Sequence, residues 1–138
     1  MALHMLDTDT ASFLIRRKDP ALDARVSQVP LGDLCISAVT RGELLYGLRL
    51  LEGAHRLESL LDLFLRRLQS FAWDSGAADH FAKIAASLHK AGTKIGTIDA
   101  MIAGHARSIG AILITNNVRH FVRVEGLDVE NWTARDHS

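Results

Sequence analysis

Short apolar runs alternate along this chain with longer stretches in which apolar residues recur every three or four positions. A short apolar run is typical of a buried strand, and the helical spacing is typical of an amphipathic helix. We expect strands at residues 3–6, 34–37, 70–73, 111–115 and 127–129. Strands that alternate with helices predict an α/β fold with a parallel sheet. No linker, repeat or low-complexity stretch interrupts the pattern, so residues 1–138 are expected to form one domain.

The longer stretches predict helices. We expect them from residue 10 to the Asp19-Pro20 step, then at 20–26, 44–51, 54–69, 75–90 and 97–106. In the helix at 54–69 a regular apolar stripe is formed by Leu57, Leu60, Leu61, Phe64 and Leu68. Leu63 lies off this stripe, either as an isolated surface leucine or as part of a second apolar face that binds a partner chain.

The helix at 44–51 is apolar on more than one face. Leu44, Leu48 and Leu51 share one face, and Tyr46 and Leu50 lie on another. A helix of this kind is buried on more than one side. The sheet can cover one side, and the other side needs a neighbour.

Composition narrows the classes of function. The formal net charge is zero, which argues against a protein held on nucleic acid mainly by bulk positive charge. It leaves open an enzyme that grips phosphate through a metal ion and a local arginine patch. Cys35 is the single cysteine, so no internal disulfide is expected. The N-terminus carries no signal pattern and no apolar stretch is long enough to span a bilayer, so we expect a cytoplasmic protein.

Polar side chains follow several of the predicted strands directly. Asp7 and Asn116-Asn117 each end an apolar run, Glu43 lies one helical turn after the second strand, and Asp99 begins the helix that leads into the fourth. In an open parallel sheet these turns lie on one edge, where ligands bind. We therefore expect these side chains to converge.

Each of these residues also has a structural explanation. Asp7 or Thr8 would cap the first helix, and Thr97 the helix at 97–106. Thr40 and Glu43 have the spacing of a capping box. Capping does not explain why carboxylates converge on one edge.

Carboxylates that lie close together repel one another unless a cation neutralises them. Oxygen ligands favour Mg²⁺, with Mn²⁺ as a substitute, and such an ion activates water for attack on a phosphodiester. The histidines are scattered, without an H-E-x-x-H motif or paired cysteines, so zinc is not expected. His105 is expected to be a packed or hydrogen-bonding helix residue.

With these residues laid out, the chain resembles the PIN-domain ribonucleases from end to end, specifically the VapC-type toxins of type II toxin–antitoxin systems. The matching stretches are residues 5–8, 36–47, 96–106, 115–121 and 127–132. The resemblance implies a three-layer α/β/α sandwich around a five-stranded parallel sheet. It implies Mg²⁺-dependent endonucleolytic cleavage of RNA, often in a tRNA anticodon stem-loop.

The resemblance also assigns roles to individual residues. Asp7 and Asp99 match the metal ligands, and Glu43 matches the remaining acidic catalytic position. Thr115 and Asn117 match auxiliary catalytic positions near the metal.

The same resemblance implies partners. VapC-like proteins form homodimers and are blocked by a VapB-like antitoxin, through which a larger assembly binds operator DNA. An antitoxin helix or tail offers an account of the second apolar faces, with Tyr46, Leu50 and Leu63 as the expected contacts.

Two positions depart from the family pattern. Asn116-Asn117 stand where many PIN domains have a fourth acid, which argues against a second tightly held metal. Asp9 stands where close relatives often have Asn, and either adds charge at the rim of the site or favours the first turn of its helix.

Other functions compete with this one. Asp7-Thr8-Asp9-Thr10 resembles the D-x-D motif of haloacid-dehalogenase-like phosphohydrolases, in which Asp7 would be the nucleophile. Ala11 stands where that motif needs Thr or Val. A receiver domain would use Asp74 as phosphoacceptor, and a non-enzymatic DNA-binding module is a third alternative.

Overall fold

The structure is a computed structural model and describes residues 2–134. Its strands are β1 (His4–Leu6), β2 (Leu34–Ser37), β3 (Gln69–Phe71), β4 (Ile112–Ile114) and β5 (Val129–Glu130). In this part of the chain they form one parallel sheet of five strands in the order β3-β2-β1-β4-β5. The expected parallel α/β sheet is confirmed. The third strand begins and ends earlier than expected, and the fifth begins later.

The helices connect these strands in sequence order. They are α1 (Thr8–Arg16), α2 (Pro20–Ser27), a 3₁₀ turn (Leu31–Asp33), α3 (Ala38–Arg49), α4 (His55–Arg67), α5 (Ser75–Lys90), α6 (Thr97–Ser108) and α7 (Val118–Phe121). The short helix α7 was not expected. No helix in the described range is long and apolar enough to cross a membrane.

The expected helix starts have different outcomes. The cap expected at Asp7 is confirmed, because Asp7 accepts a hydrogen bond from the Thr10 N–H at 2.9 Å, and α1 begins at Thr8, two residues earlier than expected. Helix α3 begins at Ala38 with Ser37 as its cap, so Thr40 and Glu43 lie inside the helix and form no capping box. Helix α6 begins at Thr97 as expected, but the cap position is taken by Gly96, so the expected cap at Thr97 is wrong.

Alternate residues of the central strands face opposite layers, as the two-residue repeat of a strand requires. One face contributes Leu6, Leu34, Ile36 and Ile114 to a core with α1, α2, α3 and α4. The other face contributes Met5, Cys35 and Leu113 to a core with α5, α6 and α7. Both faces of the sheet are therefore buried, and the three-layer prediction is confirmed.

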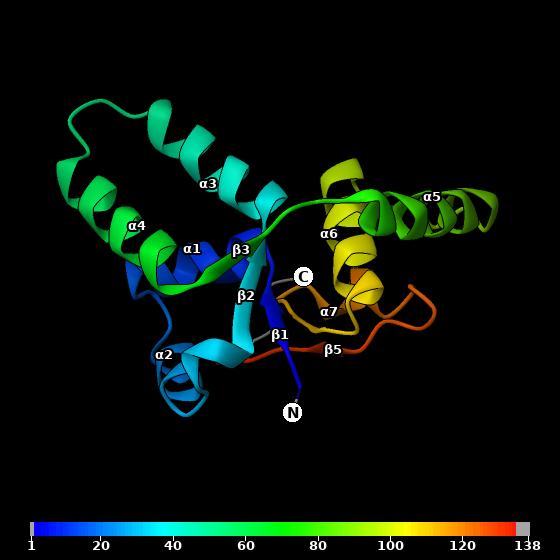
Figure 1. Ribbon diagram of the computed structural model, residues 1–138, viewed down its shortest axis with the longest axis horizontal. Helices are drawn as coiled ribbons and strands as arrows, with labels where there is room; N and C mark the ends of the chain where they lie inside the picture. The colour runs from blue at the N-terminus through cyan, green and yellow to red at the C-terminus, as the bar shows by residue number, and fades with distance from the viewer. Residues whose placement is uncertain (1, 135–138) are drawn as a thin grey trace.

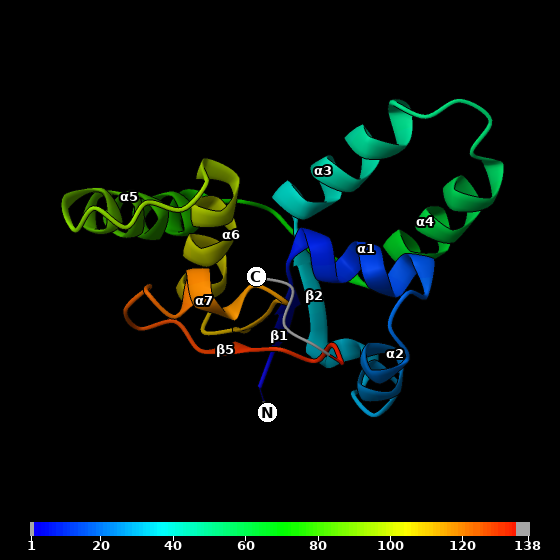
Figure 2. The ribbon, with the colours of Figure 1, turned by 180° about the vertical axis from the view of Figure 1, so that it is seen from behind.

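The two helical layers have different shapes. Helices α3 and α4 form a hairpin that projects from one side of the sheet, with α1 and α2 beneath it (Figure 1). Helices α5 and α6 lie on the opposite side, and the view from behind shows the same separation (Figure 2). Between the layers, Ser37 Oγ lies 2.8 Å from His105 Nδ1, which ties the start of α3 to α6 and confirms the expected role of His105.

Candidate active site

Four carboxylates line one pocket at the carboxyl edge of the sheet. Asp7 follows β1, Asp9 lies in the first turn of α1, Glu43 comes from α3, and Asp99 from the first turn of α6. The pocket has a volume of about 270 Å³. The structure thus brings together Asp7, Glu43 and Asp99, as the parallel topology predicts. Asp9 lies on the same pocket, where its charge adds to theirs.

Asp7 is the most deeply buried of these carboxylates, with 5% of its surface exposed. Burial raises the pKa of its side chain to about 6, and hydrogen bonds from Thr115 and Thr10 only partly oppose that shift. The backbone fixes it in place, because the Asp7 N–H donates to the Ile114 carbonyl at 3.0 Å. The fold therefore holds a carboxylate where water stabilises its charge poorly.

The pKa of Asp99 is also raised, first by burial and then by the charge of Asp9, with a further contribution from Glu43. His120 acts in the opposite direction. The carboxylates are thus near enough to oppose each other's ionisation. A bound cation would remove that penalty.

Glu43 has a different environment. Thr8 Oγ1 donates a hydrogen bond to Glu43 Oε1 at 2.5 Å and lies 3.2 Å from Thr40 Oγ1. Thr40 and Glu43 are three residues apart in α3, so their side chains share the face that meets α1. Their spacing is explained by this contact between helices rather than by a capping box.

Thr115 and Asn117 lie beside the pocket rather than among the residues that line it. Thr115 Oγ1 accepts a hydrogen bond from the Asn117 N–H at 2.9 Å, and Thr115 acts on the pKa of Asp7. Asn117 Nδ2 lies 2.8 Å from His120 Nδ1. Among residues 2–134, Asn117 Oδ1 finds no hydrogen-bond partner although it is buried.

His120 is the residue near the site that sequence reasoning missed. It lies in α7, a helix that was not expected, and its charge lowers the pKa of Asp99. The available signal was its position three residues after Asn117, which places both on one face of a helix.

The donor set fits a hard cation held partly through water. In residues 2–134 no group of three or more Asp, Glu, His or Cys side chains is arranged to hold a metal ion. Mg²⁺ usually keeps several waters and binds through one or two carboxylates. Asp7 and Asp99, both made hard to ionise by their surroundings, fit that pattern.

The three residues expected to bind a partner are all on the surface. Tyr46 and Leu50 are each 66% exposed on or next to the end of α3, and Leu63 is 41% exposed on α4. Leu51, expected to be buried with Leu44 and Leu48, lies just beyond α3 and is 48% exposed.

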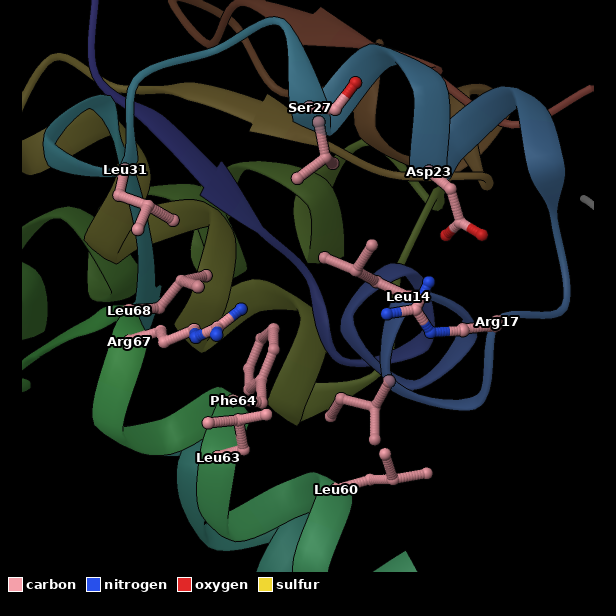
Figure 3. Close-up of a pocket in the computed structure, with 12 residues that line it drawn as sticks. Leu14, Arg17, Asp23, Ser27, Leu31, Leu60, Leu63, Phe64, Arg67 and Leu68 are labelled. Atoms are coloured by element: carbon pink, nitrogen blue, oxygen red, sulfur yellow. The ribbon is translucent and has the colours of Figure 1, made fainter.

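Leu63 borders an apolar groove between α1, α2 and α4, which has a volume of about 310 Å³. Figure 3 shows Leu60, Leu63 and Phe64 reaching it from α4, with Leu14 of α1 across from them. Arg17 and Arg67 lie at its sides in the same view. The groove is therefore mostly apolar in its lining, and its charged groups are Arg17, Arg67 and Asp23.

Comparison with known proteins places the chain in a family. The PIN domain family model matches residues 5–127. The tRNA(fMet)-specific endonuclease VapC of Shigella flexneri is 40% identical over 133 residues, covering 96% of this chain and 100% of the relative. Ribonuclease VapC2 of Haemophilus influenzae is 40% identical over 132 residues, covering 96% and 99%.

A solved structure agrees with this assignment. The DNA-bound VapBC complex from Salmonella typhimurium contains a chain that superposes with a TM-score of 0.88 at 38% identity, covering 96% of this chain and 99% of that one. On the family model and these whole-length relatives, this chain belongs to the PIN-domain family and, within it, to the VapC proteins.

Proposed function

We propose that this chain is an RNA-cleaving toxin of a VapBC system, dependent on Mg²⁺ and inhibited by a VapB-like antitoxin. One observation carries the catalytic part of the proposal: carboxylates from β1, α1, α3 and α6 line one pocket. Names of whole-length relatives support ribonuclease activity, since they include a tRNA(fMet)-specific endonuclease and a ribonuclease.

In this proposal Asp7 and Asp99 hold the ion. The pKa of both carboxylates is raised, so their ionised forms are disfavoured. A bound divalent cation would stabilise these ionised forms. When bound, Mg²⁺, or Mn²⁺ in its place, supplies an activated water and neutralises charge that develops on the phosphate. Thr115 and Asn117 keep Asp7 in position from the side of β4, and His120 moderates the charge around Asp99.

Glu43 orients the attacking water and takes its proton. Its carboxylate shares the pocket with Asp7 and Asp99 but is tied to Thr8. A carboxylate in this position acts as a general base through a hydrogen bond to water. This role does not require Glu43 to coordinate the ion.

The RNA that we propose as substrate is a tRNA, cleaved in its anticodon stem-loop. The Shigella flexneri relative is named for tRNA(fMet), and it matches this chain over 96% of its length. The neutral formal charge of the chain favours recognition by local contacts over bulk attraction.

The antitoxin is proposed to lay an amphipathic segment along the groove between α1, α2 and α4. The apolar lining from Leu14, Leu60 and Phe64 suits leucine-like side chains. Arg17 and Arg67 at the margin suit acidic residues on the same segment.

Tyr46 and Leu50 form a second exposed patch. We assign this patch to contact with another chain, either in a homodimer or in the toxin–antitoxin assembly. That assembly would bind operator DNA, as the solved complexes of relatives are DNA-bound.

A cleavage assay with deacylated tRNA tests the catalytic proposal. Purified protein should cut the RNA with Mg²⁺ or Mn²⁺ and stop on addition of EDTA. Asp99→Asn should lower kcat at least about 100-fold, as loss of an electrostatic catalytic group does, while circular dichroism stays unchanged. Full activity of Asp99→Asn would refute the metal-binding role.

The rival functions gain no support. Asp74, the phosphoacceptor of a receiver-like alternative, caps α5 by accepting from the Ala77 N–H at 3.0 Å. The D-x-D phosphohydrolase would need Asp7 as nucleophile, but Ala11 stands where that motif needs Thr or Val. The whole-length relatives carry nuclease names.

A further inference from the structure

We propose that Thr8 is a positioning residue that holds the Glu43 carboxylate in place for the reaction, so that Glu43 acts through water rather than as a ligand of the ion. This inference rests on the proposed nuclease function. It assigns Thr8 a role that follows from a hydrogen bond between α1 and α3.

The hydrogen-bond geometry allows one arrangement of protons when Glu43 is ionised. A carboxylate only accepts, so the single hydroxyl proton of Thr8 goes to Glu43 Oε1. The Thr8 oxygen is then free to accept from Thr40 Oγ1, 3.2 Å away. Thr40 is completely buried, so the packing of its side chain fixes the position of the oxygen that orients Thr8. A fixed chain from Thr40 through Thr8 thus ends on Glu43.

The series of hydrogen bonds from Thr40 through Thr8 distinguishes Glu43 from the other carboxylates of the pocket. Asp7, Asp9, Glu43 and Asp99 all line the pocket, but the side chains of Asp7 and Glu43 have different hydrogen-bond partners. Glu43 accepts a hydrogen bond from Thr8 at the α1–α3 contact, whereas Asp7 accepts a hydrogen bond from the Thr10 N–H within α1. The arrangement separates a carboxylate that orients water from the pair that binds the cation.

The test compares Thr8→Val, which keeps the shape of the side chain but removes its hydroxyl, with Thr8→Ser, which keeps the hydroxyl. On a tRNA substrate with Mn²⁺, Thr8→Val should lower kcat about 10–100-fold, the range found when partners that orient a site residue are lost. KM should stay within threefold of the parent protein. Thr8→Ser should recover kcat to within threefold of it. Thr93→Val, a matched loss of a hydroxyl in the loop between α5 and α6, should leave kcat unchanged.

Two further measurements separate positioning from a merely structural effect. Adding Thr8→Val to Glu43→Gln should lower kcat no more than twofold further, because both changes remove the same function. Calorimetric titration with Mn²⁺ should give a Kd within threefold of the parent protein for Thr8→Val and for Glu43→Gln, but not for Asp99→Asn. Additive effects in the double variant, or a fall in Mn²⁺ affinity for Thr8→Val as large as for Asp99→Asn, would overturn the proposal. So would a kcat for Thr8→Val within twofold of the parent.

Failure of the nuclease proposal would look different. In that case the parent protein would not cut tRNA with any divalent ion. The hydrogen bond could still be measured by urea unfolding in EDTA, where the shifts in midpoint for Thr8→Val and Glu43→Gln should be non-additive in the double variant. Strict additivity there would contradict the bond itself.

Discussion

The two helical layers of this protein differ in how completely they cover themselves. In the layer of α5 and α6, Gly104 lets the helices approach so closely that a Cβ on it would lie 2.6 Å from the Phe81 nitrogen. The layer of α1 to α4 leaves an apolar groove beside Leu63 and an exposed patch at Tyr46 and Leu50. The first layer is closely packed at Gly104, and we propose that the second is completed by another chain.

The difference bears on function because the candidate site lies where the layers meet. Asp99 is positioned by the layer of α5 and α6, and Glu43 by the layer of α1 to α4. We propose that a partner on the layer of α1 to α4 acts on the site through Glu43, whereas Asp99 belongs to the layer of α5 and α6. Asp7 lies between the layers at the end of β1. Burial disfavours its ionised form, so ionisation of Asp7 lowers the free energy of unfolding.

The largest expected effect is at that junction. Since burial raises the pKa of Asp7 from 3.8 to about 6, the folded state binds the proton more tightly than the unfolded chain. The free energy of unfolding should fall as pH rises from about 4 to about 6, with a total loss of about 3 kcal/mol that persists above pH 6. Asp7→Asn, which can still cap α1, should recover up to that amount at pH 7 in EDTA.

Urea unfolding across this pH range measures the effect, and Mn²⁺ is the control. The ion should stabilise the parent protein at pH 7 and leave Asp7→Asn nearly unchanged. If Asp7→Asn is less stable than the parent protein at pH 7, the ionised Asp7 carboxylate does not destabilise the fold.

The next effect should appear in the layer of α1 to α4. Leu63→Asp places a charge at the margin of the groove and should weaken antitoxin binding about 10–100-fold, as loss of a well-packed contact does. Titration with the purified antitoxin by calorimetry measures this. Val122, 63% exposed just after α7 and outside the groove, supplies the control Val122→Asp. Equal affinity for the two variants would leave Leu63 as an isolated surface leucine.

The smallest effect compares helical glycines from the two layers. Gly104→Ala should lower the free energy of unfolding by about 1–3 kcal/mol, because the new methyl group meets the backbone of α5. Gly47→Ala in α3, where a Cβ meets nothing within 4 Å, should be neutral or stabilise by about 0.5–1 kcal/mol. Thermal unfolding of both variants measures the difference. Equal shifts would mean that the layers are not packed differently at these positions.

Much of the fold could be predicted because short apolar runs indicate buried strands. The run around Leu113 is buried on both faces and gave β4 within one residue at each end. The predicted convergence of Asp7, Glu43 and Asp99 followed from topology alone, since parallel strands end on one edge.

The remaining features depend on contacts between distant residues. Thr40 and Glu43 have capping-box spacing, but Ser37 caps the helix first and Thr8 of α1 binds Glu43 instead. Helix α7 is too short for a periodic pattern, so His120 was missed. The groove beside Leu63 needs three helices to define it, which no single helical stripe reveals.

We propose that Asp7 and Asp99 together bind one divalent cation. Calorimetric titration of Mn²⁺ into the parent protein, Asp7→Asn and Asp99→Asn tests it without any assay of activity. We expect one site in the parent protein and a Kd weakened at least about 10-fold in each variant. Unchanged Mn²⁺ affinity in either variant, or no binding to the parent protein, would contradict the account.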